Sequence, residues 1–231
     1  VNGIDLDEFN PAADPLLYAG FDADSLEKKA ENKKFLQERL GLAVRDDVPL
    51  IIMITRLVGH KGVDLVQRVM EDLMWDDLQL VVIGTGEWQY EEMFRSYAGR
   101  FPAKMSANIV FDNTLAHQAY AGADLVLMPS KQEPCGLTQL IAMRYGTIPI
   151  VRETGGLFDT VPAYNIETGE GNGFTFKSYN AHDMLDAVRR GESLFQDKEH
   201  WTALQKSVMA YDSSWKRSVQ EYWDIYRSMM E

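Results

Sequence analysis

The chain has 231 residues, of which 45% are hydrophobic, and this suits one large α/β domain or two small ones around a buried core. Its 35 acidic and 23 basic residues give a net charge of −12. Such a charge disfavours nucleic acid and anionic membranes as partners, so an anionic ligand would need a local pocket of positive charge. The only cysteine, Cys135, cannot form an intramolecular disulfide, which favours a reducing, intracellular setting.

The apolar runs and the first residues bear on targeting. No apolar run is long enough to cross a bilayer. The opening stretch, VNGIDLDEF, has no basic segment followed by an apolar one, so no signal peptide is expected. Because the sequence begins with Val1 rather than Met, we expect it to be an excerpt of a longer protein.

Short apolar segments alternate with segments of helical period. The charged segment DSLEKKAENKKFLQERLGL predicts a surface helix that ends at Gly41. Strands are predicted at Leu50–Ile54, Leu78–Gly84, Ala107–Phe111, Asp124–Met128, Thr147–Val151 and Gly173–Phe176. Helices are predicted at Val63–Met74, Trp88–Tyr97, Leu115–Ala121 and Leu137–Tyr145, after a cap at Asn180, and from Asp197 to the end. Repeated βα units with continuously apolar strands predict a Rossmann-like parallel sheet with helices on both faces.

The last predicted helix carries an aromatic side. Within SSWKRSVQEYWDIYRSMM, roughly one side of the helix carries Trp215, Val219, Trp223, Ile225 and Tyr226. Such a surface requires a partner. One interpretation is packing against its own domain, and the other is docking on a second domain that the sequence does not contain.

Two cations and one aromatic residue follow predicted strands. In an open parallel sheet, ligands bind beyond the carboxyl ends of the strands. Arg56 and Lys61 lie in TRLVGHKG after the first strong strand, where an acidic protein that binds a diphosphate needs positive charge. Phe111 ends the third strand and is a candidate stacking platform for a base. Surface solvation of Arg56 and Lys61, and core packing of Phe111, are the alternatives.

A glycine pair follows the second strong strand. Gly84 and Gly86 would fit the dinucleotide fingerprint only with a third glycine at position 89, where the chain has Gln89. A tight structural turn and a close approach to a ligand both remain open. A further pair, Gly155 and Gly156, follows the fifth strand.

The segment SKQEPCGLTQL after the fourth strand combines an acid with a helix start. Gly136, Leu137 and Thr138 open the helix, and their free backbone N–H groups suit a phosphate, although an ordinary turn is the alternative. Glu133 would oppose a phosphate, so its charge fits sugar hydroxyls or a cationic transition state better, unless it is only a helix-start acid. Cys135 either packs or lines a sugar pocket.

No metal site is predicted. His60 and His117 lack metal-ligand spacing and are interpreted as solvated or structural residues. The acidic stretch at Asp22–Asp24 precedes a charged helix rather than ending a strand, which favours a loop.

Several motifs together resemble a known family. The stretches VNGID, TRLVGHKG, IGTGE and EPCGLTQLIAMRYGTIPIVRETGGLFDTV, followed by DSSW, resemble the carboxyl-terminal half of bacterial glycogen synthases and plant starch synthases. These are ADP-glucose-using, retaining glycosyltransferases of family 5. The resemblance covers nearly the whole chain. It implies one half of a two-domain GT-B enzyme, whose carboxyl-terminal domain binds the sugar nucleotide and whose final helix crosses back to the other domain.

The resemblance implies roles for particular residues. Arg56 and Lys61 match the Arg and Lys that hold the distal phosphate and stabilise the leaving diphosphate. Glu133 matches the acid near the donor glucose. The segment 135–138 (Cys135, Gly136, Leu137 and Thr138) matches the residues that cradle glucose and phosphate.

Two positions differ among these families. The glycogen and starch synthases usually have a Tyr stacked on the adenine where this chain has Phe111, which preserves stacking but not a hydroxyl contact. The related family 4 transferases carry a second Glu eight positions after the first. Here that position is Ile141, which favours family 5.

The implied domain is a single nucleotide-sugar-binding unit over residues 1–231, with 212–231 as a terminal helix expected to dock on an amino-terminal domain. That domain would supply a Lys-Thr-Gly-Gly-Leu loop and much of the acceptor cleft. The stretch Glu153–Leu157 is a different element without a Lys.

The implied activity is transfer of glucose from ADP-glucose to the non-reducing end of glycogen or starch, with retention, in the cytoplasm or a plastid. Neither a metal nor another cofactor is expected, because Arg56, Lys61 and a helix start can balance the leaving group. One alternative is a module that binds ADP or ADP-glucose without turnover. Another is a Rossmann dehydrogenase, against which Gln89 argues.

Overall fold

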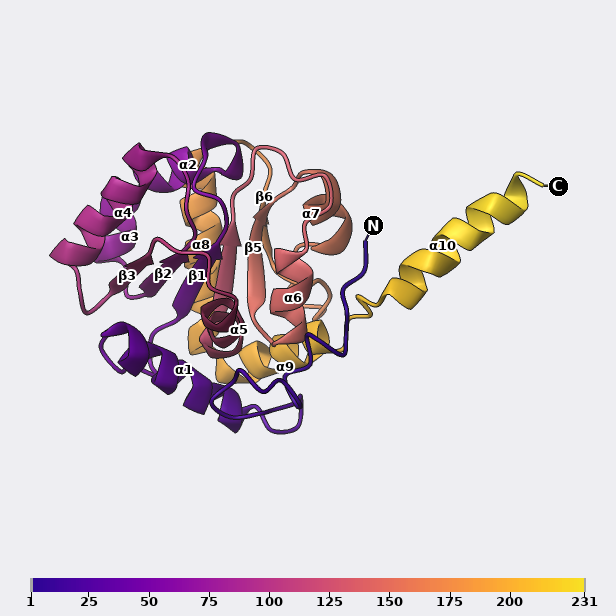
Figure 1. The fold of residues 1–231 in the computed structure, drawn as a ribbon, viewed down its shortest axis with the longest axis horizontal. Helices are drawn as coiled ribbons and strands as arrows, with labels where there is room; N and C mark the ends of the chain where they lie inside the picture. The colour runs from indigo at the N-terminus through magenta and orange to yellow at the C-terminus, as the bar shows by residue number, and fades with distance from the viewer. Residues whose placement is uncertain (1, 231) are drawn as a thin grey trace.

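A parallel sheet of six strands forms the centre of this computed structural model, which describes residues 2–230 (Figure 1). The strands are β1 (Leu50–Ile54), β2 (Gln79–Ile83), β3 (Met105–Asn108), β4 (Leu125–Met128), β5 (Ile148–Arg152) and β6 (Phe174–Phe176). Their order is β3-β2-β1-β4-β5-β6, with every neighbouring pair parallel. This is a Rossmann-like order, and the predicted fold class is confirmed. The chain reverses its direction of travel between β1 and β4, the place where such sheets bind ligands.

Helices cover both faces of the sheet (Figure 1). One face carries α5 (Asn113–Gly122), α6 (Thr138–Arg144) and α7 (Gly155–Thr160), and α1 (Glu27–Leu40) packs on α5. The other carries α2 (Val63–Arg68), α3 (Met70–Trp75), α4 (Trp88–Arg100) and α8 (Ala181–Gln196), and α9 (Lys198–Met209) follows α8. The central strands β1, β2, β4 and β5 are buried almost throughout, which explains their continuous apolar sequences. None of the described helices is both long enough and apolar enough to span a bilayer.

Two buried polar groups tie the outer layer to the sheet. The ammonium of Lys33 lies 2.7 Å from the carboxylate of Asp124, which also accepts the N–H of Leu50 at 2.8 Å. The Lys29 ammonium donates to two carbonyl groups of α5 and to the hydroxyl of Thr147. Burial lowers the pKa of Lys29 to about 7, because the interior disfavours the charged form. These bonds fix α1 against the amino ends of the strands.

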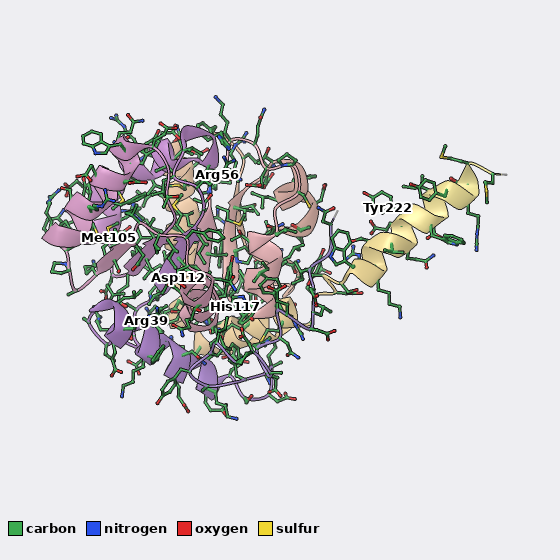
Figure 2. The ribbon with its side chains drawn as sticks, in the orientation of Figure 1. Arg39, Arg56, Met105, Asp112, His117 and Tyr222 are labelled. Carbon is green, nitrogen blue, oxygen red and sulfur yellow. The ribbon has the colours of Figure 1, made fainter. Side chains whose placement is uncertain are left out.

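His117 is a buried structural residue. The sequence leaves open whether it is solvated or structural. Its Nδ1 lies 2.7 Å from the Asp14 carboxylate, which also accepts the Tyr145 hydroxyl at 2.6 Å (His117 is labelled in Figure 2). Burial and the bond to Asp14 raise the pKa of Tyr145. This network anchors the amino-terminal segment to α5 and α6. Within residues 2–230, no group of three His, Cys, Asp or Glu side chains could hold a metal ion.

Several predicted boundaries were wrong. The third strand ends at Asn108 rather than at Phe111, because its neighbour β2 ends at Ile83, the partner of Asn108. The predicted helix Val63–Met74 breaks into α2 and α3 at Val69. The predicted final helix is interrupted after α9 and begins again at Trp215, with Ser214 as its cap. In contrast, Gly41 ends α1 in a left-handed conformation and Asn180 caps α8, as predicted.

The terminal helix α10 (Trp215–Ser228) projects away from the rest of the molecule (Figure 1). Among its described residues only Ser218 is buried. Its large apolar side chains are at least 47% exposed: Trp215, Val219, Tyr222, Trp223, Ile225 and Tyr226. The aromatic side therefore does not pack on its own domain, and that interpretation was wrong.

The turn after β2 requires glycine for a steric reason. Gly84 has φ +149°, and a Cβ built there would lie 1.8 Å from the carbonyl oxygen of Thr55. Gly86 lies against Leu57 in the same way, with its N–H donating to Glu91 at 2.9 Å. The segments that follow β1 and β2 are thereby held in direct backbone contact.

We predict that Gly84→Ala lowers the free energy of unfolding by roughly 2 kcal/mol or more, since both the space and the backbone conformation exclude a side chain. Gly99→Ala is the matched control. Gly99 lies in α4 with open space around its Cα, so alanine there should stabilise the protein by about 0.5–1 kcal/mol. Urea titration of both variants measures the difference. Equal stabilities would show that the turn tolerates a side chain.

Candidate functional site

Two adjoining pockets lie at the carboxyl edge of the sheet, where β1 meets β4. The larger has a volume of about 210 Å³ and is lined by residues from the ends of β1 and β2 and from the segment between β3 and α5. The smaller, of about 50 Å³, lies between the ends of β1 and β4 and the start of α6. Ile54 and Thr55 line both pockets, so the two are separated only by the end of β1. We call them the base pocket and the phosphate pocket, after the ligand groups that the sequence predicts for their residues.

The base pocket has an apolar floor and an aromatic wall. Its apolar lining residues include Ile54, Ile83 and Val110, and Gly84 contributes backbone. Phe111 is 95% exposed, because it lies beyond the end of β3. A ring that is free on both faces can stack on a planar ligand, and so the shift of the strand boundary leaves Phe111 available.

A cation stands at the rim of the base pocket. Arg56 lines the pocket and is exposed, and Figure 2 shows it at the edge of the sheet toward which the strands run. Across the pocket, Asp112 accepts the N–H of Leu115 at 2.9 Å and thereby caps α5. Arg56 therefore places a positive charge at the rim, and the Asp112 carboxylate lines the same pocket.

An ion pair occupies the phosphate pocket. The ammonium of Lys61 lies 2.6 Å from Oε2 of Glu133, and the Ser130 hydroxyl donates to the same oxygen at 3.0 Å. The side chains of Lys61 and Glu133 are only 19% and 12% exposed, so this pair is far less screened than a surface salt bridge. The two residues that the sequence assigned to opposite ends of a ligand are direct partners here.

Lys61 reaches this pocket because the segments after β1 and β4 touch. Lys61 ends a short 3₁₀ turn (Gly59–Lys61), and Gly62 follows with φ +78°. A Cβ on Gly62 would lie 2.1 Å from the carbonyl oxygen of Pro129. The N–H of Lys131 also donates to the carbonyl of His60 at 2.9 Å. The glycine therefore permits a backbone contact that places the ammonium of Lys61 above β4.

The start of α6 offers backbone donors to the phosphate pocket. Gly136, Leu137 and Thr138 line the pocket. In the part of the chain that the structure describes, their N–H groups donate to no protein acceptor, and no side chain caps the helix. Because α6 has only seven residues, its dipole is modest, and local N–H groups contribute more than the helix as a whole. An acceptor-rich ligand would satisfy these donors.

Two predicted site residues line neither pocket. Gly86 belongs to the turn described above, which favours its structural interpretation over contact with a ligand. The sulfur of Cys135 accepts the N–H of Asn2 at 3.3 Å, which favours packing over a place in a sugar pocket. The remaining predicted residues are brought together at the two pockets: Arg56, Phe111 and Gly84 at one, and Lys61, Glu133, Gly136, Leu137 and Thr138 at the other.

Sequence reasoning missed three residues at this edge. Thr55 separates the pockets, Ser130 holds Glu133, and Gln139 lies buried behind the loop. Ser130 stands at the first position of the SKQEPCGLTQ motif, and that position could have marked it. Neither Thr55 nor Gln139 carries a comparable signal, because a contact across the sheet leaves no local pattern.

Comparison with known proteins assigns this arrangement to a family. The model of the family "Glycosyl transferases group 1" matches residues 35–206. The chain is 52% identical over 231 residues to a glycogen synthase of Bacillus cereus (strain Q1). The matched region is 100% of this chain and 48% of that protein. It is 50% identical over 229 residues to a glycogen synthase of Clostridium botulinum, again covering 48% of that protein. The chain thus spans about half the length of the curated relatives it matches.

Solved structures give the same picture. The catalytic domain of starch synthase IV from Arabidopsis thaliana, bound to ADP and acarbose, superposes with a TM-score of 0.91 at 38% identity, covering 99% of this chain and 48% of that one. A sucrose-phosphate synthase from Thermosynechococcus elongatus shares the fold, with a TM-score of 0.66 at 19% identity and coverage of 99% and 51%. The chain therefore belongs to the glycosyl transferases of group 1, and it is similar along its whole length to glycogen and starch synthases.

Proposed function

We propose that this chain is the donor-binding half of a retaining α-1,4-glucan synthase, which transfers glucose from ADP-glucose to the non-reducing end of glycogen or starch. The observation that carries the proposal is the pairing of Lys61 with Glu133 beside the pocket of Phe111, on either side of the end of β1. These features lie at one edge of the sheet and suit the three parts of such a donor. Phe111 suits the base, the two cations suit the diphosphate, and Glu133 suits the sugar. The similarity to glycogen synthases and to a starch synthase bound to ADP supports this assignment.

The sizes of the pockets suggest how the donor lies. The base pocket accommodates adenine stacked on Phe111, and the ribose continues past Arg56. The phosphate pocket, at about 50 Å³, has room for a phosphate group rather than for a whole hexose. We therefore propose that glucose extends past Glu133 toward the edge of this domain.

The charged groups suggest how the leaving group is stabilised. As the bond between the anomeric carbon and the phosphate breaks, negative charge develops on the diphosphate and positive charge on the sugar ring. The negative charge on the diphosphate is stabilised by Arg56, Lys61 and the N–H groups of Gly136–Thr138. The positive charge on the sugar ring is stabilised by the carboxylate of Glu133. We propose that the reaction needs neither a metal nor another cofactor.

A second domain would complete the enzyme. The relatives are about twice as long as this chain, and the exposed aromatic side of α10 is suited to docking on another domain. We infer that this domain closes over the two pockets and supplies the cleft for the glucan acceptor. The competing function is a module that holds ADP or ADP-glucose without turnover. Glucosyl transfer by the chain joined to the amino-terminal half of a glycogen synthase, compared with the chain alone, separates the two.

The cations generate the first prediction for this function. Arg56→Ala and Lys61→Ala should each weaken ADP binding by roughly 1.5–3 kcal/mol, because each removes a charge-assisted hydrogen bond to phosphate. Arg68→Ala, an exposed arginine at the end of α2, is the matched control and should bind ADP normally. Calorimetric titration with ADP provides the measurement. Normal affinity in both site variants would exclude these cations from the phosphate site.

The second prediction concerns stacking of the base on Phe111. Phe111→Ala should lose roughly 1–3 kcal/mol of ADP binding, the usual contribution of a base stacked on an aromatic ring. Phe111→Tyr should bind at least as well as the parent. Trp88→Ala serves as control, since Trp88 is an aromatic residue 75% exposed on α4. If the alanine variant at position 111 binds as tightly as that control, the base lies elsewhere.

Glu133 separates binding from chemistry. Glu133→Gln should leave ADP affinity unchanged or higher, because it frees Lys61 and removes repulsion of the phosphates. In the two-domain enzyme, the same variant should raise the barrier by roughly 2.7–4 kcal/mol, the effect of losing one preorganised electrostatic group. The turnover number with ADP-glucose measures this effect. Turnover close to that of the parent would make the acid a packing residue.

A further inference from the structure

The loop that carries Glu133 is held from behind through four consecutive carbonyl groups, those of residues 133–136. The N–H of Gly156 donates to the carbonyl oxygens of Glu133 and Pro134, at 3.0 and 3.2 Å. The side-chain amide of Gln139 donates to the next two, those of Cys135 at 3.2 Å and Gly136 at 3.0 Å. Four consecutive carbonyl groups thus have their partners on the side of Gln139 and α7. The loop cannot rotate these peptide planes without breaking the bonds.

Gln139 itself is fully buried and asymmetrically bonded. Its side chain has 0% exposure. The two N–H groups of its Nε2 are shared among three acceptors, because the hydroxyl oxygen of Thr160 also lies 3.1 Å away. The Thr160 hydroxyl in turn donates to the carbonyl of Gly156 at 2.6 Å. The Oε1 of Gln139 has no partner among the described residues. A buried acceptor without a partner costs free energy, so the position demands the donor end of the amide.

The opposite orientation of the amide is excluded by the same neighbours. A rotated side chain would place Oε1 against the carbonyl oxygens of Cys135 and Gly136, which cannot donate a hydrogen bond. An apolar residue of the same length would leave both carbonyl groups buried and without partners. The loop therefore requires a hydrogen-bond donor at position 139, and a side chain that only fills the same space would not replace Gln139.

We propose that Gln139 is a positioning residue for the donor site: its amide links the loop 133–136 to α7 through Thr160 and so fixes Glu133 and the free N–H groups of Gly136–Thr138. Gln139 lines neither pocket, so it acts only through these residues. This inference rests on the proposed function, since it takes the loop to be the part that meets the nucleotide sugar.

Paired variants at two residues test the proposal. Gln139→Met keeps the length of the side chain and removes the donor, and it should weaken ADP binding about tenfold, or about 1.4 kcal/mol. Gln205→Met is the matched control, because Gln205 is a second buried glutamine whose amide donates to a carbonyl, that of Gly146, away from both pockets. It should lower the melting temperature and leave ADP affinity unchanged. Calorimetry and thermal unfolding give the two readouts.

Thr160 provides a milder test that does not depend on the folding of the Gln139 variant. Thr160→Val removes the hydroxyl that accepts from Gln139 and should weaken ADP binding several-fold, whereas Thr160→Ser keeps the hydroxyl and should restore affinity. Affinity equal to that of the parent in both Gln139→Met and Thr160→Val, while the parent binds ADP, would overturn the proposal. A parent chain that fails to bind ADP would instead contradict the proposed function.

Discussion

The contact between Lys61 and Glu133 is the constraint around which the site is organised. It joins the segment after β1 to the segment after β4, across the place where the strand order reverses. Two charges less than one-fifth exposed are costly to separate in place, because each would remain partly desolvated without a counter-ion. The contact depends in turn on backbone approach, since Gly62 lies against Pro129. Parallel pairing of β1 with β4, a glycine and one ion pair therefore set the geometry together.

The pair also explains how an acid can stand beside the proposed phosphate site. In the absence of a ligand, Glu133 is the counter-ion of Lys61, and the pocket carries little net charge. In the proposed function, a diphosphate would compete with Glu133 for that ammonium, and binding of the donor would release the carboxylate toward the sugar. Because the overall charge is −12, the proposed site would attract an anion only through cations that are placed locally.

Much of the fold and of the site could be predicted from the sequence, because both depend on local signals. Continuous apolar strands between helical segments gave the parallel sheet, and residues just after strand ends could be assigned to one edge. The ion pair could not be foreseen, since Lys61 and Glu133 are 72 positions apart and no pattern gives the distance across β1 and β4. The contacts of Gln139 were hidden for the same reason, because the sequence shows only a polar residue in an apolar helix.

Errors in the prediction arose where tertiary pairing decides the outcome. Phe111 continues an apolar run, but β3 ends when its neighbour β2 ends, so the ring is exposed rather than part of the strand. The amphipathic pattern of α10 correctly predicted a helix but could not decide whether its aromatic side packs on its own domain. In this chain the aromatic side is left free (Figure 1).

A crystal structure of the chain with ADP tests the central claim most directly. The account predicts that the ammonium of Lys61 leaves Glu133 for a phosphate oxygen, that Arg56 approaches the same diphosphate, and that adenine stacks on Phe111. ADP bound at another place on the molecule, with the 2.6 Å contact between Lys61 and Glu133 unchanged, would contradict it.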